Sequence, residues 1–102
     1  MAYYVKTKVE LKFGQNAGFN EVLAKLVPFL AGHGWKLEYG LQALIGDLTE
    51  ILHLWSVENF EDIAKGLDAA FSDPKLGQSL AKLPDLMHKE TMQIMVKTPY
   101  SP

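Results

Sequence analysis

The spacing of apolar residues changes several times along this chain, and those changes limit the folds that it can adopt. Over residues 3–13 apolar and polar side chains alternate, which is typical of a β-strand with one buried face. From Phe19 to Leu30 the apolar residues recur every three or four positions, as in a helix with one buried stripe. Alternation returns over residues 35–46 and 50–56, which indicates two further strands joined by a hairpin turn.

The second half of the chain adds helices and a final strand. Residues 60–71 carry another helical stripe, and Asp73-Pro74 predicts the start of a short helix, since aspartate caps a helix and proline suits its first position. We expect this helix to end at Pro84 and residues 86–97 to form the last strand. This order predicts an α+β, ferredoxin-like fold, with a four-stranded antiparallel sheet and helices on one face. We expect residues 1–102 to form a single domain.

The parity of the side chains predicts which residues share a face of the sheet. In the second strand one face should carry Trp35, Leu37, Tyr39 and Leu41. In the third strand one face should carry Ile51, His53 and Trp55, and the other Leu52 and Leu54. Whichever face meets the helices, apolar residues remain on the other face, and such a patch rarely stays in water on a stable monomer. The sequence therefore predicts a homodimer formed by sheet-to-sheet packing.

The composition excludes several classes of protein. Apolar residues make up 48% of the chain and charged residues 22%, which is ordinary for a globular domain. The net charge is -2, arginine is absent and the lysines are scattered, so neither nucleic acid nor an anionic membrane is an expected partner. Without cysteine there is no disulfide, thiolate metal site or cysteine nucleophile. With neither a signal peptide nor an apolar run of spanning length, we expect a cytoplasmic protein.

His53 is the residue best suited by its chemistry to catalysis or ligand binding. Beside Trp55 on a half-buried strand, its imidazole could act as a general base or orient a substrate. The alternative is a structural histidine satisfied by one hydrogen bond, and that interpretation has about twice the weight of the catalytic one. His33 and His88 lie far away in the sequence, so no metal site is expected.

Four aromatic residues are candidates for the wall of a ligand pocket between the helices and the sheet. They are Phe13, Trp35, Tyr39 and Trp55. Pockets for small molecules are mostly apolar with a few polar groups, which such a set of side chains together with His53 would provide. The alternative, equally weighted, is that these aromatic residues only fill the core.

Four short motifs, taken with the order of the elements, point to a known family. They are Gly34-Trp35-Lys36-Leu37, His53-Leu54-Trp55, Asp73-Pro74 and Pro99-Tyr100-Ser101-Pro102. The chain resembles the NIPSNAP family of the dimeric α/β-barrel superfamily, and its last residues are similar to the end of some small bacterial members. The resemblance implies a ferredoxin-like protomer and a dimer whose two sheets form a barrel. The family has no agreed catalytic residues, so none is transferred to this chain.

The residues and the resemblance leave three functions open. The first is a homodimeric protein that binds a small apolar or aromatic ligand in a pocket formed by Trp35, Tyr39, Trp55 and Phe13, with no cofactor. The second is a cofactor-free monooxygenase or isomerase with His53 as the general base, a class that the resemblance to the wider superfamily implies. The third is a protein-interaction module without a ligand. Whether the chain is an enzyme stays open, since no nucleophile–base pair is visible in the sequence.

Overall fold

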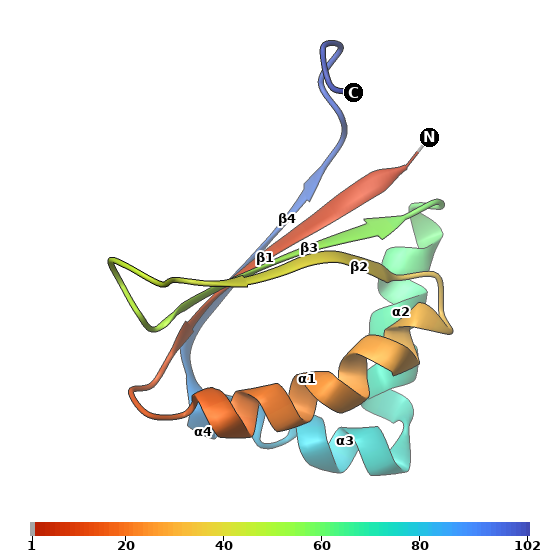
Figure 1. Cartoon of the computed structure of the whole chain (residues 1–102). Helices are drawn as coiled ribbons and strands as arrows, with labels where there is room; N and C mark the ends of the chain where they lie inside the picture. Colours follow the sequence, from red (N-terminus) through yellow and green to blue (C-terminus); the bar gives the residue numbers. More distant parts are fainter. Residues whose placement is uncertain (1) are drawn as a thin grey trace.

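One face of a four-stranded antiparallel sheet is covered by the helices of this protein (Figure 1). The computed structural model describes residues 2–102. The strands are β1 (Tyr3–Leu11), β2 (Lys36–Gln42), β3 (Glu50–Val57) and β4 (Met87–Met95). The helices are α1 (Asn16–Ala31), α2 (Glu61–Ser72), α3 (Pro74–Leu80) and the single-turn α4 (Leu83–Leu86). This architecture confirms the predicted α+β, ferredoxin-like fold.

The two central strands determine which side chains face the helices. The strand order is β2-β3-β1-β4, so β1 and β3 are the inner strands. Val5 pairs with Trp55 and Thr7 pairs with His53, and all four side chains are buried under the helices. Directly paired residues of an antiparallel ladder project to the same side, so the alternation seen in the sequence correctly predicts the faces of both strands.

The residues at the N-termini of α3 and α4 explain where these two helices begin. The carboxylate of Asp73 accepts a hydrogen bond from the backbone N–H of Leu76 at 2.8 Å, and Pro74 occupies the first turn of α3. This confirms the predicted cap. The prediction for Pro84 was wrong: α3 ends at Leu80, and Pro84 lies in the first turn of α4. Proline is tolerated in a first turn because its missing N–H has no partner there in any helix.

An irregularity in β2 overturns the predicted face of that strand. Leu37 pairs with Trp55, but the register shifts before Tyr39, which pairs with Leu54 on the opposite face. The extra residue is Glu38, and an inserted residue reverses the facing of every position beyond it. Tyr39 and Leu41 therefore do not share a face with Trp35 and Leu37.

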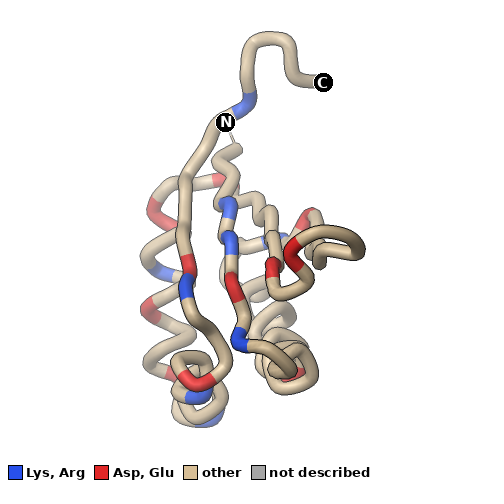
Figure 2. The backbone as a smooth tube through the Cα atoms, turned by 90° about the vertical axis from the view of Figure 1, so that its left-hand side faces the viewer, with Lys and Arg blue, Asp and Glu red and all other residues tan. Residues whose placement is uncertain are grey.

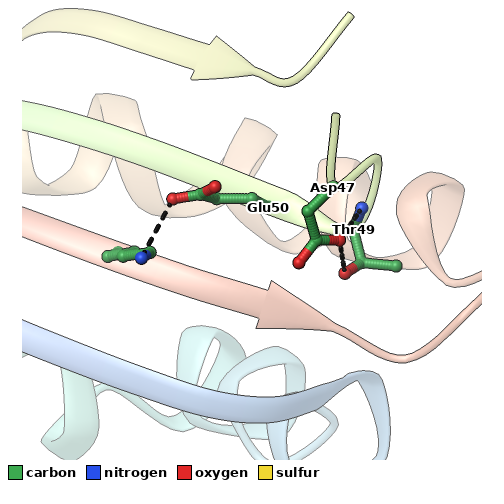
Figure 3. Close-up of polar contacts among 4 residues, drawn as sticks. Asp47, Thr49 and Glu50 are labelled. Carbon is green, nitrogen blue, oxygen red and sulfur yellow. Dashed lines mark hydrogen bonds and ion pairs between the residues drawn. The ribbon is translucent and has the colours of Figure 1, made fainter. Parts of the chain in front are cut away.

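The turn between β2 and β3 is closed by polar contacts (Figure 3). Asp47 Oδ1 accepts hydrogen bonds from the backbone N–H and the hydroxyl of Thr49, at 3.1 and 2.6 Å. These bonds lower the pKa of the Asp47 carboxyl. Immediately beyond the turn, the Glu50 carboxylate forms an ion pair with Lys8 of β1, with Oε1 3.2 Å from Nζ. This contact connects the hairpin to a central strand of the sheet.

We call the face of the sheet that points away from the helices the outer face. Within residues 2–102 no helix covers it (Figure 1). Its apolar side chains are Tyr4, Tyr39, Leu41, Leu52, Leu54 and Met95. Charged residues also occur on it. Lys6, Lys8 and Glu10 occupy every second position along β1, which carries a line of charged residues in Figure 2.

Candidate functional site

A cavity of about 180 Å³ lies between the sheet and the helices. Its wall consists mainly of apolar side chains from α1, α2, α3, β1 and β3. Three polar residues interrupt that wall, namely Thr7, His53 and Glu90. An engineered apolar cavity of similar size, about 150 Å³, holds benzene, so this space suits a ligand of about one aromatic ring.

A row of four rings forms one side of this cavity. Trp35 and Trp55 meet edge to face with their ring centroids 5.6 Å apart. The Trp55 ring meets His53 edge to face at 5.9 Å, and His53 in turn stacks on Phe19 at 6.0 Å. All four residues line the cavity, so β3, α1 and the residue that precedes β2 place an imidazole in the middle of an aromatic wall.

The first residue of this row is held by a hydrogen bond and by close packing. The indole N–H of Trp35 donates to the backbone carbonyl of Asp62 at 2.8 Å. At the same edge of the ring, a Cβ atom added at Gly66 of α2 would overlap Nε1 and Cδ1 of the indole. The glycine thus lets α2 approach the ring closely, and the ring orientation is fixed before any ligand binds.

The imidazole of His53 is buried but has no hydrogen-bond partner. The residue is 9% exposed, and none of the side-chain hydrogen bonds within residues 2–102 involves its ring. No fully buried side-chain nitrogen in that range lacks a partner, so the ring nitrogens of His53 keep contact with solvent. Burial lowers the pKa of His53 and favours the neutral ring, which can accept one hydrogen bond and donate another.

Glu90 is a polar group of the cavity that the sequence reasoning missed. It belongs to the edge strand β4 and pairs with Val9, so it projects toward the helices. Burial raises the pKa of its carboxyl group, and no ion pair with it forms within residues 2–102. The signal was available, because Glu90 has the same parity as Met92 and Ile94.

The cavity opens to solvent at the edge formed by β4. Phe71 and Met92 both line the cavity, yet they are 67% and 43% exposed. Glu90 lines it as well and is also exposed. A ligand can therefore enter between the end of α2 and β4, past a carboxyl group.

Two of the aromatic candidates lie outside this cavity. Tyr39 projects from the outer face because of the irregularity in β2, and it is 63% exposed. Phe13 follows the end of β1 at Leu11 and is 92% exposed, since it lies in a turn rather than in the strand. The structure thus brings Trp35, Trp55 and His53 together and leaves Tyr39 and Phe13 elsewhere.

The described part of the chain offers no grouping typical of a bound metal or a membrane span. Among residues 2–102, no three histidine or carboxylate side chains come together as potential ligands. His33 instead bonds the carbonyl of Phe29 at the end of α1, with Nδ1 2.9 Å from that oxygen. In the same range no helix is both long and apolar enough to cross a bilayer.

Comparison with known proteins relates the chain to one family. Residues 8–102 match the family model described as NIPSNAP. No curated protein matches the sequence. Two solved structures of NIPSNAP family proteins from Agrobacterium tumefaciens are similar to this fold. The first, whose function is described as unknown, has a TM-score of 0.84 at 24% identity and covers 99% of this chain and 92% of its own. The second has a TM-score of 0.84 at 18% identity and covers 100% and 98%.

A third similar structure is that of an enzyme. SnoaB from Streptomyces nogalater, described as a cofactor-independent oxygenase, has a TM-score of 0.73 at 15% identity. The match covers 99% of this chain and 96% of that protein. At this level of identity the likeness concerns the fold.

Proposed function

Because the chain belongs to the NIPSNAP family, for which fold alone does not define an activity, we propose a function from its own cavity. We propose that it binds a small, uncharged aromatic or apolar molecule of about one ring between the helices and the sheet. Trp35 and Trp55 would contact the ring of the ligand, and His53 would bond its polar group. Tyr39 and Phe13 have no part in this proposal, because they lie outside the cavity.

The observation that carries this proposal is the unpartnered imidazole inside an apolar space. No fully buried side-chain nitrogen within residues 2–102 lacks a hydrogen-bond partner, so the ring nitrogens of His53 are reached by solvent and can bond a ligand in its place. His53 has no partner among the side chains and main chain around it, although it is 9% exposed. A hydroxyl or carbonyl group of a ligand would supply that partner.

The volume of the cavity defines the size of the ligand. At about 180 Å³ it is smaller than the roughly 300–1,000 Å³ of sites for drug-sized molecules. A phenol therefore fits the proposal better than a fused polycyclic compound. We choose p-cresol as the probe, since it combines one apolar ring with one hydroxyl group.

The experiment is a calorimetric titration with p-cresol. Ala70 is buried in α2 and lines the cavity, so Ala70→Leu should fill the space and abolish binding. Ala64 is exposed on the same helix, so Ala64→Leu is the matched control and should bind like the wild type. If the wild type binds no p-cresol, or if Ala70→Leu binds equally well, the cavity is not the site and the ligand-free interaction module becomes the better account.

A second candidate function is proton-transfer catalysis by a cofactor-free enzyme, either a monooxygenase or an isomerase. The specific observation in its favour is that burial lowers the pKa of His53, because a general base must be unprotonated at working pH. The similarity of the fold to a protein described as a cofactor-independent oxygenase points in the same direction. His53 would then accept a proton from the hydroxyl group of a bound phenol or quinol.

Catalysis and simple binding are distinguished by turnover. The wild type and His53→Ala are compared on a panel of phenols and quinols, with Ala64→Leu as the folded control. Catalysis by His53 predicts turnover that His53→Ala loses and Ala64→Leu keeps. Equal turnover in His53→Ala, or none in any of the three proteins, rejects His53 as a base and leaves binding alone.

We also propose a homodimer formed through the outer faces of two sheets. The support is the apolar set that includes Leu52 and Leu54, together with Tyr39, which is 63% exposed on a single chain. Lys6, Lys8 and Glu10 oppose a fully dry interface, so we expect water or complementary charges around β1. The cavity faces the helices, so this dimer would leave it open.

A further inference from the structure

A second hollow approaches His53 from the opposite edge of the sheet. This groove has a volume of about 230 Å³ and lies between α1 and the end of β2. Phe19, Leu23 and Ile51 form its apolar floor, and Asn20 and Gln42 stand at its exposed rim. His53 lines both this groove and the interior cavity. The imidazole therefore lies between the groove and the interior cavity and lines both of them.

The groove exists over the imidazole because residue 40 has no side chain. Gly40 pairs with His53 across β2 and β3, on the side that faces the helices. A Cβ atom at Gly40 would lie 3.5 Å from Cδ2 and 3.8 Å from Nε2 of His53, which is ordinary contact. Any larger side chain would extend from there into the groove.

The backbone does not require glycine at this position. The glycines with positive φ are Gly14, Gly34 and Gly46, and Gly40 is not among them. Glycine inside a strand weakens the strand unless something must approach closely. The shift of register at Glu38 is what directs position 40, rather than Tyr39, toward the imidazole. The irregular strand and the glycine together leave the imidazole of His53 bordering the groove.

The two openings differ in chemistry. The interior cavity opens at β4 beside the Glu90 carboxyl group, whereas the polar groups at the rim of the groove are uncharged amides. β2 and β4 are the two outer strands, so the openings lie at opposite edges of the sheet. A ligand that fills the interior would close the first route to the imidazole and leave the second one free.

We propose that the groove over Gly40 is a second entrance to the site, through which water reaches the imidazole of His53 while the interior cavity is occupied. This inference rests on the proposed function, because it assigns a separate route to solvent at that same site. It gives a buried proton acceptor a path for exchanging its proton with water. A dimer formed through the outer faces would leave the groove accessible.

The test measures how fast diethyl pyrocarbonate modifies His53, with His33 and His88 as internal references in the same peptide map. In the wild type we expect His53 to react. In a Met92→Trp background, which narrows the opening at β4, Gly40→Ile should slow its modification by about tenfold or more, because neither route then admits the reagent. Gly40→Ala adds only one methyl group, so His53 should react at a rate between those of the glycine and isoleucine proteins. This second variant still tests the groove if the isoleucine variant does not fold.

The opposite entrance provides the matched control. Met92→Trp alone narrows the opening at β4 and should leave His53 reactive through the groove. Wild-type protein saturated with p-cresol should also keep its reactive His53. An unreactive His53 in the wild type, equal rates in Met92→Trp with and without the Gly40 substitutions, or loss of reactivity on adding p-cresol would each overturn the second entrance.

Failure of this inference differs from failure of the proposed function. The comparison of Gly40 variants without ligand needs no binding, so it still measures the groove if calorimetry detects no p-cresol. Conversely, if p-cresol binds and protects His53 completely, the cavity is a ligand site with one entrance.

Discussion

The indole ring of Trp35 and the backbone of Gly66 lie in direct contact, where α2 crosses the start of β2. The ring N–H bonds the carbonyl of Asp62 one turn earlier in the same helix, so α2 holds the indole at two points. Trp35 is almost completely buried and touches Trp55 edge to face. The absence of a side chain at Gly66 therefore determines the position of the first ring in the cavity wall.

A methyl group at this contact should destabilise the protein. For Gly66→Ala we expect a loss of about 1–3 kcal/mol in the free energy of unfolding, the usual range for overpacking a core. Gly77→Ala in α3 is the control, since its Cβ would meet only ordinary contacts and alanine favours a helix by up to about 1 kcal/mol over glycine. Urea denaturation measures both. A Gly66→Ala variant as stable as the wild type would mean that α2 and Trp35 are not packed this closely.

The titration of His53 should make stability depend on pH. Burial lowers the pKa of His53 in the folded state below its ordinary 6.5, so the unfolded chain takes up the proton first. Stability conferred by the neutral ring is complete above about pH 6.5 and is lost as the pH falls, by at most about 1.4 kcal/mol per pH unit for one proton.

The measurement compares the wild type with His53→Phe, which keeps a ring but cannot titrate. Between pH 7.5 and pH 5, denaturant unfolding should show the wild type losing stability relative to the variant. Glu90 lines the same cavity and is present in both proteins, so its titration cancels in the comparison. A constant difference across this range would show that His53 is as solvated when folded as when unfolded.

Glu90 should act in the opposite direction. Burial raises the pKa of its carboxyl group above 4.5, so ionisation disfavours the folded state. The penalty is absent below pH 4.5 and develops as the pH rises through the folded-state pKa. Glu90→Gln should therefore be more stable than the wild type at pH 7 and equally stable at pH 4. Equal stability at both pH values would show that the cavity does not desolvate this carboxyl group.

A charge on the outer face should separate the proposed dimer. Leu54 lies on the inner strand β3 and projects from that face, so Leu54→Glu would bury a carboxylate from each protomer in the proposed interface. Ala64→Glu adds the same charge on an exposed position of α2 and should not change the assembly. Sedimentation should give a dimer for the wild type and Ala64→Glu, and a monomer for Leu54→Glu. A monomeric wild type would refute the dimer directly.

Local patterns predict β1 and β3 well, because each strand is regular and has one buried face. The parity that includes Val5 and Thr7, and the parity of His53 and Trp55, both correspond to the side that faces the helices. The cap at Asp73 is equally local, since one carboxylate and one proline define it.

The errors arise where one residue changes the register or the end of an element. The inserted Glu38 reverses the facing of Tyr39, although a glycine two residues later is a known sign of an irregular strand. Phe13 fits the alternation of β1, but the strand stops at Leu11. The interior position of Glu90 follows from the parity that it shares with Met92 and Ile94, but a carboxylate is not expected on an apolar face.

The central claim is that the cavity beside His53 is a ligand site, and NMR can test it at the atoms involved. The chain has two tryptophans, both in the cavity wall, so 5-fluorotryptophan labelling gives two reporter signals at the site. We predict that p-cresol shifts both ¹⁹F signals saturably at concentrations up to about 1 mM, equivalent to roughly −4 kcal/mol of binding energy. Nuclear Overhauser contacts should also appear between its ring protons and the His53 imidazole. Two unshifted fluorine signals and no such contacts at this concentration would contradict the claim.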